Sequence, residues 1–112
     1  MRTLTRTSAV AGVLLAGFLV AAPGAEAATT TVAVSNFKYS PTPVTIVHGN
    51  SVKWTNTSLL TTHTVTADSG AWSLTLSPSG RLGSTKTRTF LRAGTYRYHC
   101  KFHNMHGSVI VK

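Results

Sequence analysis

The sequence predicts an all-β fold, a sandwich or barrel built from short strands. After the first 27 residues the chain is rich in Thr, Val, Ser and Gly, and no segment shows the hydrophobic period of an amphipathic helix. Apolar and polar residues instead alternate in short runs, and clusters of turn-forming residues separate these runs. The length of 112 residues is enough for one domain.

Six runs of alternating residues are the expected strands. In each run the residues of one parity should face the core, because successive side chains of a strand point to opposite sides of the sheet. Along the chain, the expected inward sets are Val32 and Val34; Val44 and Ile46; Val52 and Trp54; His63 and Val65; Tyr96, Tyr98 and Cys100; Val109 and Val111. Turns are expected at residues 48–50, 68–70, 77–80 and 93–94, and loops at 56–62 and 69–84.

Residues 1–27 have the pattern of a secretory signal peptide. The first eight residues hold two arginines and no acid, residues 9–22 are apolar, and Ala25-Glu26-Ala27 fits a small-x-small cleavage site. The apolar segment is short for a membrane span, although an uncleaved anchor is the alternative. We therefore expect an exported protein, periplasmic or extracellular, whose mature domain comprises residues 28–112 and has no membrane span.

The mature segment is strongly basic. It keeps nine of the eleven Lys and Arg residues and has Asp68 as its single acid, which gives a formal charge of +8. Such a charge favours an acidic protein partner or an anionic surface, and the alternative is a solvated basic surface without a dedicated partner. Nucleic acid is not expected, because no basic and aromatic motif accompanies the charge. We expect a monomer.

The segment from Tyr96 to Val111 carries the residues with distinctive chemistry. Cys100 is the only cysteine, so it cannot form an internal disulfide and is an inert thiol, a reactive thiol or a metal ligand. His103 lies three residues later and Met105 follows closely. A thiolate, an imidazole and a thioether on one tight loop favour copper, because soft sulfur suits Cu(I) and imidazole suits both oxidation states. His63, on a predicted strand, is the best candidate for a further imidazole.

In these residues the sequence resembles the cupredoxins, the small blue copper proteins, and especially their short plastocyanin- and amicyanin-like members. The resemblance spans nearly the whole mature chain, and its most specific part is the Tyr-x-Cys-x-x-His motif at Tyr98, Cys100 and His103. The other elements, which follow in family order, are Asn36-Phe37, Tyr39-Ser40-Pro41, Val44, Ile46, Gly49, Val52-Lys53-Trp54, Asn56, His63-Thr64-Val65, Phe90, Gly94-Thr95-Tyr96 and Gly107.

The resemblance implies a Greek-key β-sandwich with one copper ion near one end. It implies His63, Cys100 and His103 as equatorial ligands, Met105 as a weak axial ligand, and transfer of single electrons between redox partners. Two positions depart from the usual family pattern. Only Asn104 separates His103 from Met105, and the usual methionine position holds His106, so His106 is the alternative axial ligand. Thr64 stands where many members have asparagine, and its hydroxyl is expected to hydrogen-bond to the cysteine loop.

Other functions fit the sequence less well. The mature chain has one acid and no evident nucleophile–base pair, so we do not expect an enzyme. A copper carrier or storage protein is the alternative function, but the mature chain has one methionine rather than a cluster. A metal-free adhesive sandwich would leave the Cys100 loop unexplained. His48 lies in a turn and His99 should face away from Cys100, so neither is an expected ligand.

Overall fold

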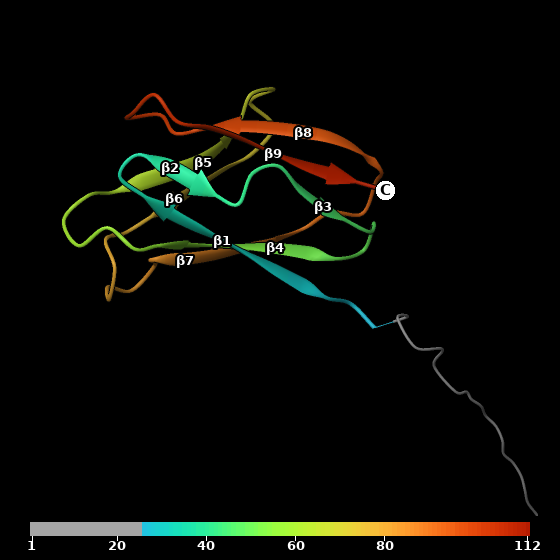
Figure 1. Ribbon diagram of the computed structural model, residues 1–112, viewed down its shortest axis with the longest axis horizontal. Helices are drawn as coiled ribbons and strands as arrows, with labels where there is room; N and C mark the ends of the chain where they lie inside the picture. Colours follow the sequence, from blue (N-terminus) through green and yellow to red (C-terminus); the bar gives the residue numbers. More distant parts are fainter. Residues whose placement is uncertain (1–25) are drawn as a thin grey trace, which may run out of the picture.

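Nine strands in two facing sheets make up the described part of the chain, residues 26–112, in a computed structural model (Figure 1). They are β1 (Thr29–Ser35), β2 (Lys38–Ser40), β3 (Val44–Ile46), β4 (Ser51–Asn56), β5 (His63–Ala67), β6 (Ser73–Leu76), β7 (Thr85–Thr89), β8 (Gly94–His99) and β9 (His106–Val111). The described residues contain no helix long and apolar enough to cross a membrane. The expected signal peptide lies outside the described residues, apart from its last two positions.

The two sheets are mixed. The four-stranded sheet has the order β2-β1-β4-β7, and the five-stranded sheet has the order β3-β9-β8-β5-β6. β1 pairs in parallel with β4, and β3 in parallel with β9, whereas the other pairs are antiparallel. The chain crosses repeatedly from one sheet to the other, so neighbours in each sheet come from distant parts of the sequence. The predicted all-β sandwich is therefore confirmed.

The core lies between the sheets and contains most of the residues that alternation placed inward, together with Phe90, Tyr39 and Leu76; Tyr96, which was also expected inward, is only partly buried. Trp54, Tyr98 and Phe90 are its largest fully buried side chains. The predicted inward residues of the valine-rich strands are all buried: Val32, Val34, Val44, Ile46, Val52, Val109 and Val111. Burial of this apolar surface is the main favourable contribution to folding.

Three strands have no counterpart among the expected ones. β6 occupies residues 73–76, so the expectation of a continuous loop over 69–84 was wrong. β2, β6 and β7 are each at the edge of a sheet, where one side of the strand has no partner. β7 has the sequence TKTRT and carries no buried residue. Polar edge strands leave no hydrophobic pattern, because little of their surface enters the core.

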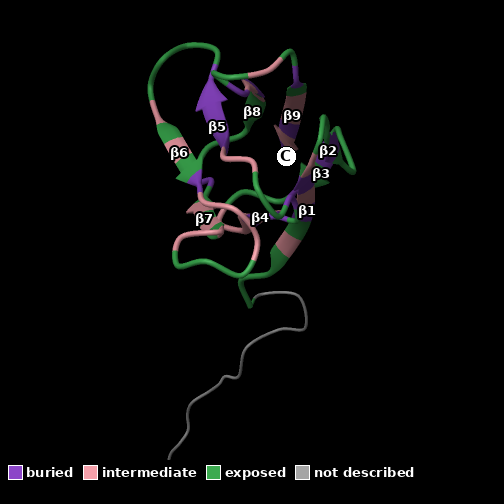
Figure 2. Ribbon diagram, turned by 90° about the vertical axis from the view of Figure 1, so that its left-hand side faces the viewer, coloured by how far each residue is buried: buried purple, intermediate pink, exposed green. Residues whose placement is uncertain are grey.

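β5 is buried on both faces, which alternation did not predict. His63 and Val65 point inward as expected, but Thr64 and Thr66 on the other parity are also buried, as the continuous purple of β5 in Figure 2 shows. β5 is the second strand from the edge of its sheet, between β6 and β8. The buried hydroxyls are satisfied by hydrogen bonds to each other, to Ser73 of β6 and to the backbone of the loop after β8.

Three connections gather at one end of the sandwich, on the left in Figure 1. They are the turn between β1 and β2, the loop of residues 57–62 before β5, and the loop of residues 100–105 between β8 and β9. The turn at residues 48–50 lies at the other end, where the backbone of His48 bonds to the carbonyl of Lys112. All of the expected metal ligands belong to the first end.

Gly107 lies within β9, directly opposite Tyr98 of β8. A Cβ atom at this position would come within 2.5 Å of the Tyr98 ring. Glycine is therefore required here for space and not for a turn. It leaves room for a buried aromatic ring to lie against the backbone of the neighbouring strand.

Gly107→Ala is expected to lower the free energy of unfolding by about 1–3 kcal/mol, because the fully buried Tyr98 ring cannot move aside without disturbing the core. Denaturant unfolding of the metal-free protein measures the change. Ser108→Ala, at the next position on the outer face of β9, is the control and should unfold close to the wild type. An unchanged midpoint for Gly107→Ala would show that the strand pair adapts at little cost.

Candidate metal site

His63, Cys100 and His103 come together at the loop end of the sandwich. One nitrogen of each histidine and the Cys100 sulfur all lie within 4.8 Å of one another. The Cys100 Sγ is 3.9 Å from Nδ1 of His63 and 3.8 Å from Nδ1 of His103. Residues that are 37 positions apart in the chain thus converge on one point, as the sequence predicted.

The loop after β8 holds two of these residues close together. The Cys100 N–H donates to the carbonyl of Met105 at 3.1 Å, and the Met105 N–H donates to the carbonyl of His103 at 2.9 Å. These bonds fold residues 100–105 into a tight connection before β9 begins at His106. The spacing of two residues between Cys100 and His103 therefore places both donors on the same side of the turn.

Thr64 joins this loop to β5. Its backbone N–H donates to the Cys100 Sγ at 3.4 Å, and its hydroxyl accepts a hydrogen bond from the N–H of Lys101 at 2.9 Å. The Tyr39 hydroxyl donates to the Thr64 carbonyl at 2.6 Å. The hydrogen bond predicted between the threonine side chain and the cysteine loop is therefore present, and it holds Cys100 next to His63.

Asn36 orients the His63 ring. Its Oδ1 atom is 2.9 Å from Nε2 of His63, and the hydroxyl of Ser58 donates to the same oxygen at 3.0 Å. Because an amide oxygen can only accept, Nε2 carries the proton and Nδ1 keeps its lone pair. Nδ1 is the atom that faces Cys100. This arrangement fixes the tautomer that a metal ion requires.

Sequence reasoning did not assign Asn36 to the site. It lies in the turn between β1 and β2, 27 positions before His63, and no local spacing connects the two residues. The sequence indicated Asn36 only as one element of the family resemblance, without a role at the site. The contact arises from the pairing of the strands, which a local pattern does not encode.

The environment of His63 favours the neutral imidazole. The His63 side chain is fully buried, and this burial lowers its pKa below the usual value. The neighbouring His103 lowers the pKa of His63 further, because two positive charges would repel each other. A neutral ring is the form that binds a metal ion.

Met105 and His106 differ sharply in exposure. Met105 is 2% exposed and belongs to the core cluster. His106 is exposed, and its Nε2 is 3.0 Å from Oδ1 of Asn104. It is paired across the strands with His99, away from the core. The burial supports Met105 as the residue that can approach the cluster from inside.

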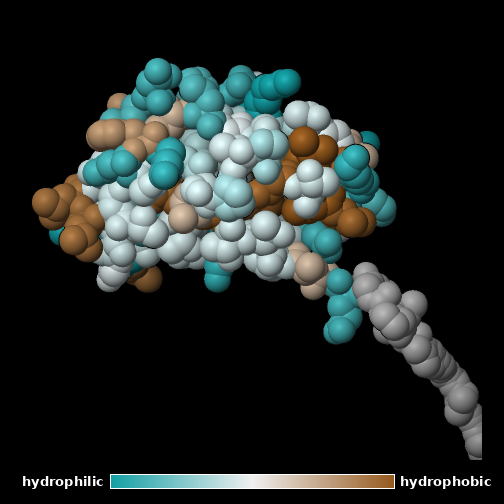
Figure 3. All heavy atoms as spheres, in the orientation of Figure 1, coloured by the Kyte–Doolittle hydropathy of each residue, from teal (hydrophilic) through white to brown (hydrophobic). Residues whose placement is uncertain are grey.

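Exposed apolar side chains surround the cluster at the surface. The Phe37 ring lies 4.9 Å from the ring of His103, which is itself only partly buried. Phe102 is exposed, as are Leu59 and Leu60 in the loop before His63. The left end of the molecule in Figure 3 shows this concentration of brown, hydrophobic surface. The cluster therefore lies at an end of the sandwich that carries several exposed apolar side chains.

The donor set is compatible with a single type 1 copper site. One sulfur and two imidazole nitrogens suit copper in both oxidation states, and a buried thioether lies in the same loop. These donors are already gathered by hydrogen bonds from the protein itself. His48 and His99 are not part of the cluster, in agreement with the sequence analysis.

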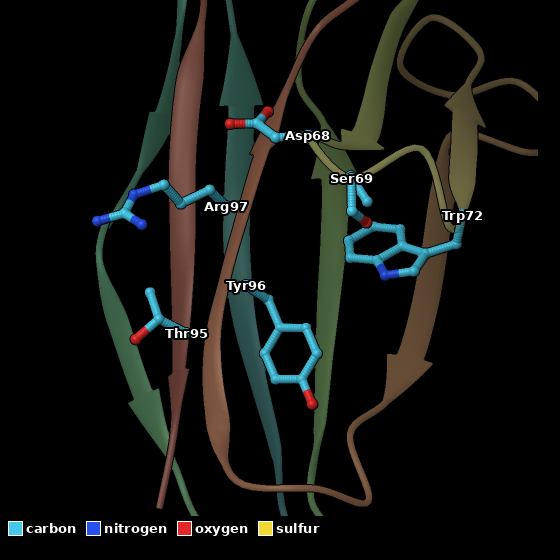
Figure 4. A pocket seen from close by; sticks show the side chains of 7 residues that line it. Asp68, Ser69, Trp72, Thr95, Tyr96 and Arg97 are labelled. Carbon is cyan, nitrogen blue, oxygen red and sulfur yellow. The ribbon is translucent and has the colours of Figure 1, made fainter.

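A surface hollow of about 400 Å³ lies elsewhere, on the side of the sandwich. Figure 4 shows Trp72 and Tyr96 lining it, with Asp68 and Arg97 at its edge. It contains none of the clustered donors. The size of a hollow therefore does not identify the functional site in this protein, whereas the grouping of ligand atoms does.

Comparison with known proteins agrees with this geometry. A family model described as a cupredoxin-like domain matches residues 8–111. The reduced state of an amicyanin mutant is 28% identical, with a TM-score of 0.61 over 82% of this chain and 86% of that chain. The Cu(I) form of another amicyanin mutant is 30% identical, with a TM-score of 0.60 over 75% of this chain and 82% of that one. Amicyanin from Paracoccus versutus (Thiobacillus versutus) is 29% identical, with a TM-score of 0.60 over 75% and 81%.

Asn36→Leu is expected to lower the affinity for copper by about 10- to 100-fold, because the His63 ring loses the acceptor that fixes its orientation. Competition with a chelator of known affinity measures the change. Asn50→Leu, a matched substitution at the opposite end of the sandwich, should bind copper as the wild type does. Equal affinities for the two variants would contradict an orienting role for Asn36.

Met105→Leu is expected to raise the reduction potential and alter the visible spectrum, because loss of the sulfur removes electron donation that favours Cu(II). Leucine preserves most of the buried volume, so the fold should remain intact. His106→Leu is the control and should change both properties little. Cyclic voltammetry and absorption spectroscopy distinguish the two, and the reverse pattern would assign the axial role to His106.

Proposed function

Because the chain belongs to the cupredoxin family, we propose that it is an exported type 1 copper protein that carries single electrons between redox partners. Its fold and its cluster of His63, Cys100 and His103 support a blue copper electron carrier. The single observation that carries the proposal is the convergence of these three donors within 4.8 Å, with one of them, His103, partly exposed.

The proposed ligands are His63, Cys100 and His103 around the ion, with Met105 as the weak axial donor and one copper per chain. Bound copper would supply the change between Cu(I) and Cu(II) that accepts or releases one electron. The protein holds the donors in place in both states. Thr64 fixes the sulfur from one side and Asn36 fixes the imidazole from the other, so little rearrangement accompanies the change of charge.

His103 is the proposed point at which electrons enter and leave. It is the least buried member of the cluster, and the exposed Phe37 and Phe102 lie beside it. An apolar surface of this kind can be covered by a partner with little cost in desolvation. Contact there would bring a second redox centre close to the copper and exclude water from the space between them.

Export and a basic docking surface complete the proposal. Residues 1–27 are proposed to direct export to the periplasm or the extracellular space, which N-terminal analysis of the exported protein would test by finding Ala28 rather than Met1 first. The charge of +8 on residues 28–112 favours a redox partner with an acidic docking surface.

Cys100→Ser is expected to abolish the intense visible band of the Cu(II) protein, because a hydroxyl oxygen cannot replace the soft thiolate. It should also abolish electron exchange with a small inorganic oxidant. Unfolding of the metal-free variant, which should resemble the wild type, is the control for folding. A coloured, redox-active Cys100→Ser variant would rule out the proposed site. A wild type that binds copper colourlessly and releases it to a chelator would indicate a copper carrier instead.

Electron transfer to an acidic redox protein is expected to slow as ionic strength rises, because salt screens the attraction between opposite charges. Stopped-flow rates at low and high salt measure the effect. A neutral small-molecule reductant provides the comparison and should show a weaker dependence. Rates that stay constant or rise with salt for the protein partner would exclude an acidic docking surface.

A further inference from the structure

A second group of metal-binding side chains lies on the outer face of the five-stranded sheet. His99 at the end of β8 and His106 at the start of β9 are directly opposite each other in the antiparallel pair. Their ring centroids are 6.4 Å apart, with the planes inclined by 41°. Asp68 follows β5 and places its Oδ1 2.7 Å from Nδ1 of His99. None of these residues belongs to the cluster around Cys100.

The hydrogen bonds leave one free lone pair on each ring. The carboxylate of Asp68 accepts from Nδ1 of His99, so Nε2 of His99 is the unprotonated nitrogen of the neutral ring. The Asn104 oxygen accepts from Nε2 of His106, so Nδ1 of that ring is the unprotonated nitrogen. A histidine whose other nitrogen donates to a carboxylate or an amide oxygen is the usual form of a metal ligand.

Asp68 supplies a negative charge beside His99, and Arg97 supplies a positive charge in the lining of the adjoining hollow. Asp68 is the only acidic residue of the strongly basic segment 28–112, and its one ion pair among the described residues is with His99. The Arg97 guanidinium points away from the carboxylate, as Figure 4 shows. The side chains of His99 and Asp68 are 34% and 47% exposed, so an ion has access.

There is open space beside His106 for the water ligands of an ion. A hollow of about 310 Å³ adjoins His106 and Asp68 between β8, β9 and the segment before β3; Arg97 also lines it, and His99 lies outside its lining. Two imidazoles on one tetrahedral ion have ring centres roughly 5 Å apart, given metal–nitrogen distances of about 2 Å. The present separation of 6.4 Å is larger than this, so binding of an ion requires the rings to move closer, and the exposed His106 ring has space to do so.

We propose that His99 and His106, with Asp68 behind His99, form a second metal site that binds one divalent ion of the zinc or copper class. Imidazole pairs suit both metals, and the site has no sulfur donor that would favour Cu(I). The site is separate from the proposed electron-transfer centre and does not depend on its redox activity.

Zinc titration of the mature protein with one equivalent of copper already bound tests the proposal, because the stronger sulfur-containing site is then filled. Calorimetry should detect one additional zinc ion per chain. His106→Gln and His99→Gln should each weaken zinc binding by about tenfold or more, and Asp68→Asn by about tenfold. His48→Gln removes the histidine of the distant turn and should leave the zinc affinity unchanged.

A second readout identifies the ligands directly. In NMR spectra of the reduced copper protein, zinc should shift the imidazole signals of His99 and His106 but not those of His48. Unchanged far-UV circular dichroism and unchanged unfolding midpoints of the metal-free variants show that His106→Gln and His99→Gln are folded. The proposal is overturned if the copper-loaded protein binds no zinc. It is overturned equally if His99→Gln and His106→Gln each bind zinc as tightly as the wild type. Loss of zinc binding in His48→Gln would also overturn it.

Discussion

The metal cluster depends on the hydrogen bonds that tie Thr64 to the loop after β8. Through its N–H and its hydroxyl, Thr64 binds the sulfur of Cys100 and the backbone of Lys101. The hydroxyl oxygens of Thr64, Thr66 and Ser73 continue this connection towards β6, with separations of 2.9 and 2.7 Å. This series of hydrogen bonds gives each buried hydroxyl a partner, and burying a hydroxyl without a partner would cost free energy. The loop is thus joined to two strands of the sheet, and the cysteine is held near His63 by the protein itself.

Alternation and ligand spacing were sufficient to predict most of the core and the three clustered donors. Val52 and Trp54, for example, are buried as their parity requires. Cys100 and His103 are brought together by a local loop, so their spacing contains the relevant information. Asn36 and the edge strand β7 could not be found in this way. The first acts through a contact between distant segments, and the second buries no apolar side chain that would produce a pattern.

The parity of β5 illustrates a further limit. Its threonines, Thr64 and Thr66, were expected to face solvent. They do lie on the face of the strand opposite the core, but both are buried. The reason is that the cysteine loop and the neighbouring strands cover this part of the outer face. Period-two alternation specifies the side of the sheet on which a residue lies. Whether that side meets solvent depends on which other segment packs over it, and this is a property of the whole fold.

The same alternation gives β8 and β9 two chemically different faces at one end of the sandwich. Cys100 and Met105 are buried, whereas the adjacent His99 and His106 are on the outside and opposite each other. The strand register that closes the inner loop therefore also fixes the outer pair. Substitution of His99 or His106 does not change the volume of the core. The backbone of these residues nevertheless holds the neighbouring Cys100 and Met105 in position. The two faces are thus independent in packing and coupled through their shared backbone, which makes the strand pair the rigid element common to both.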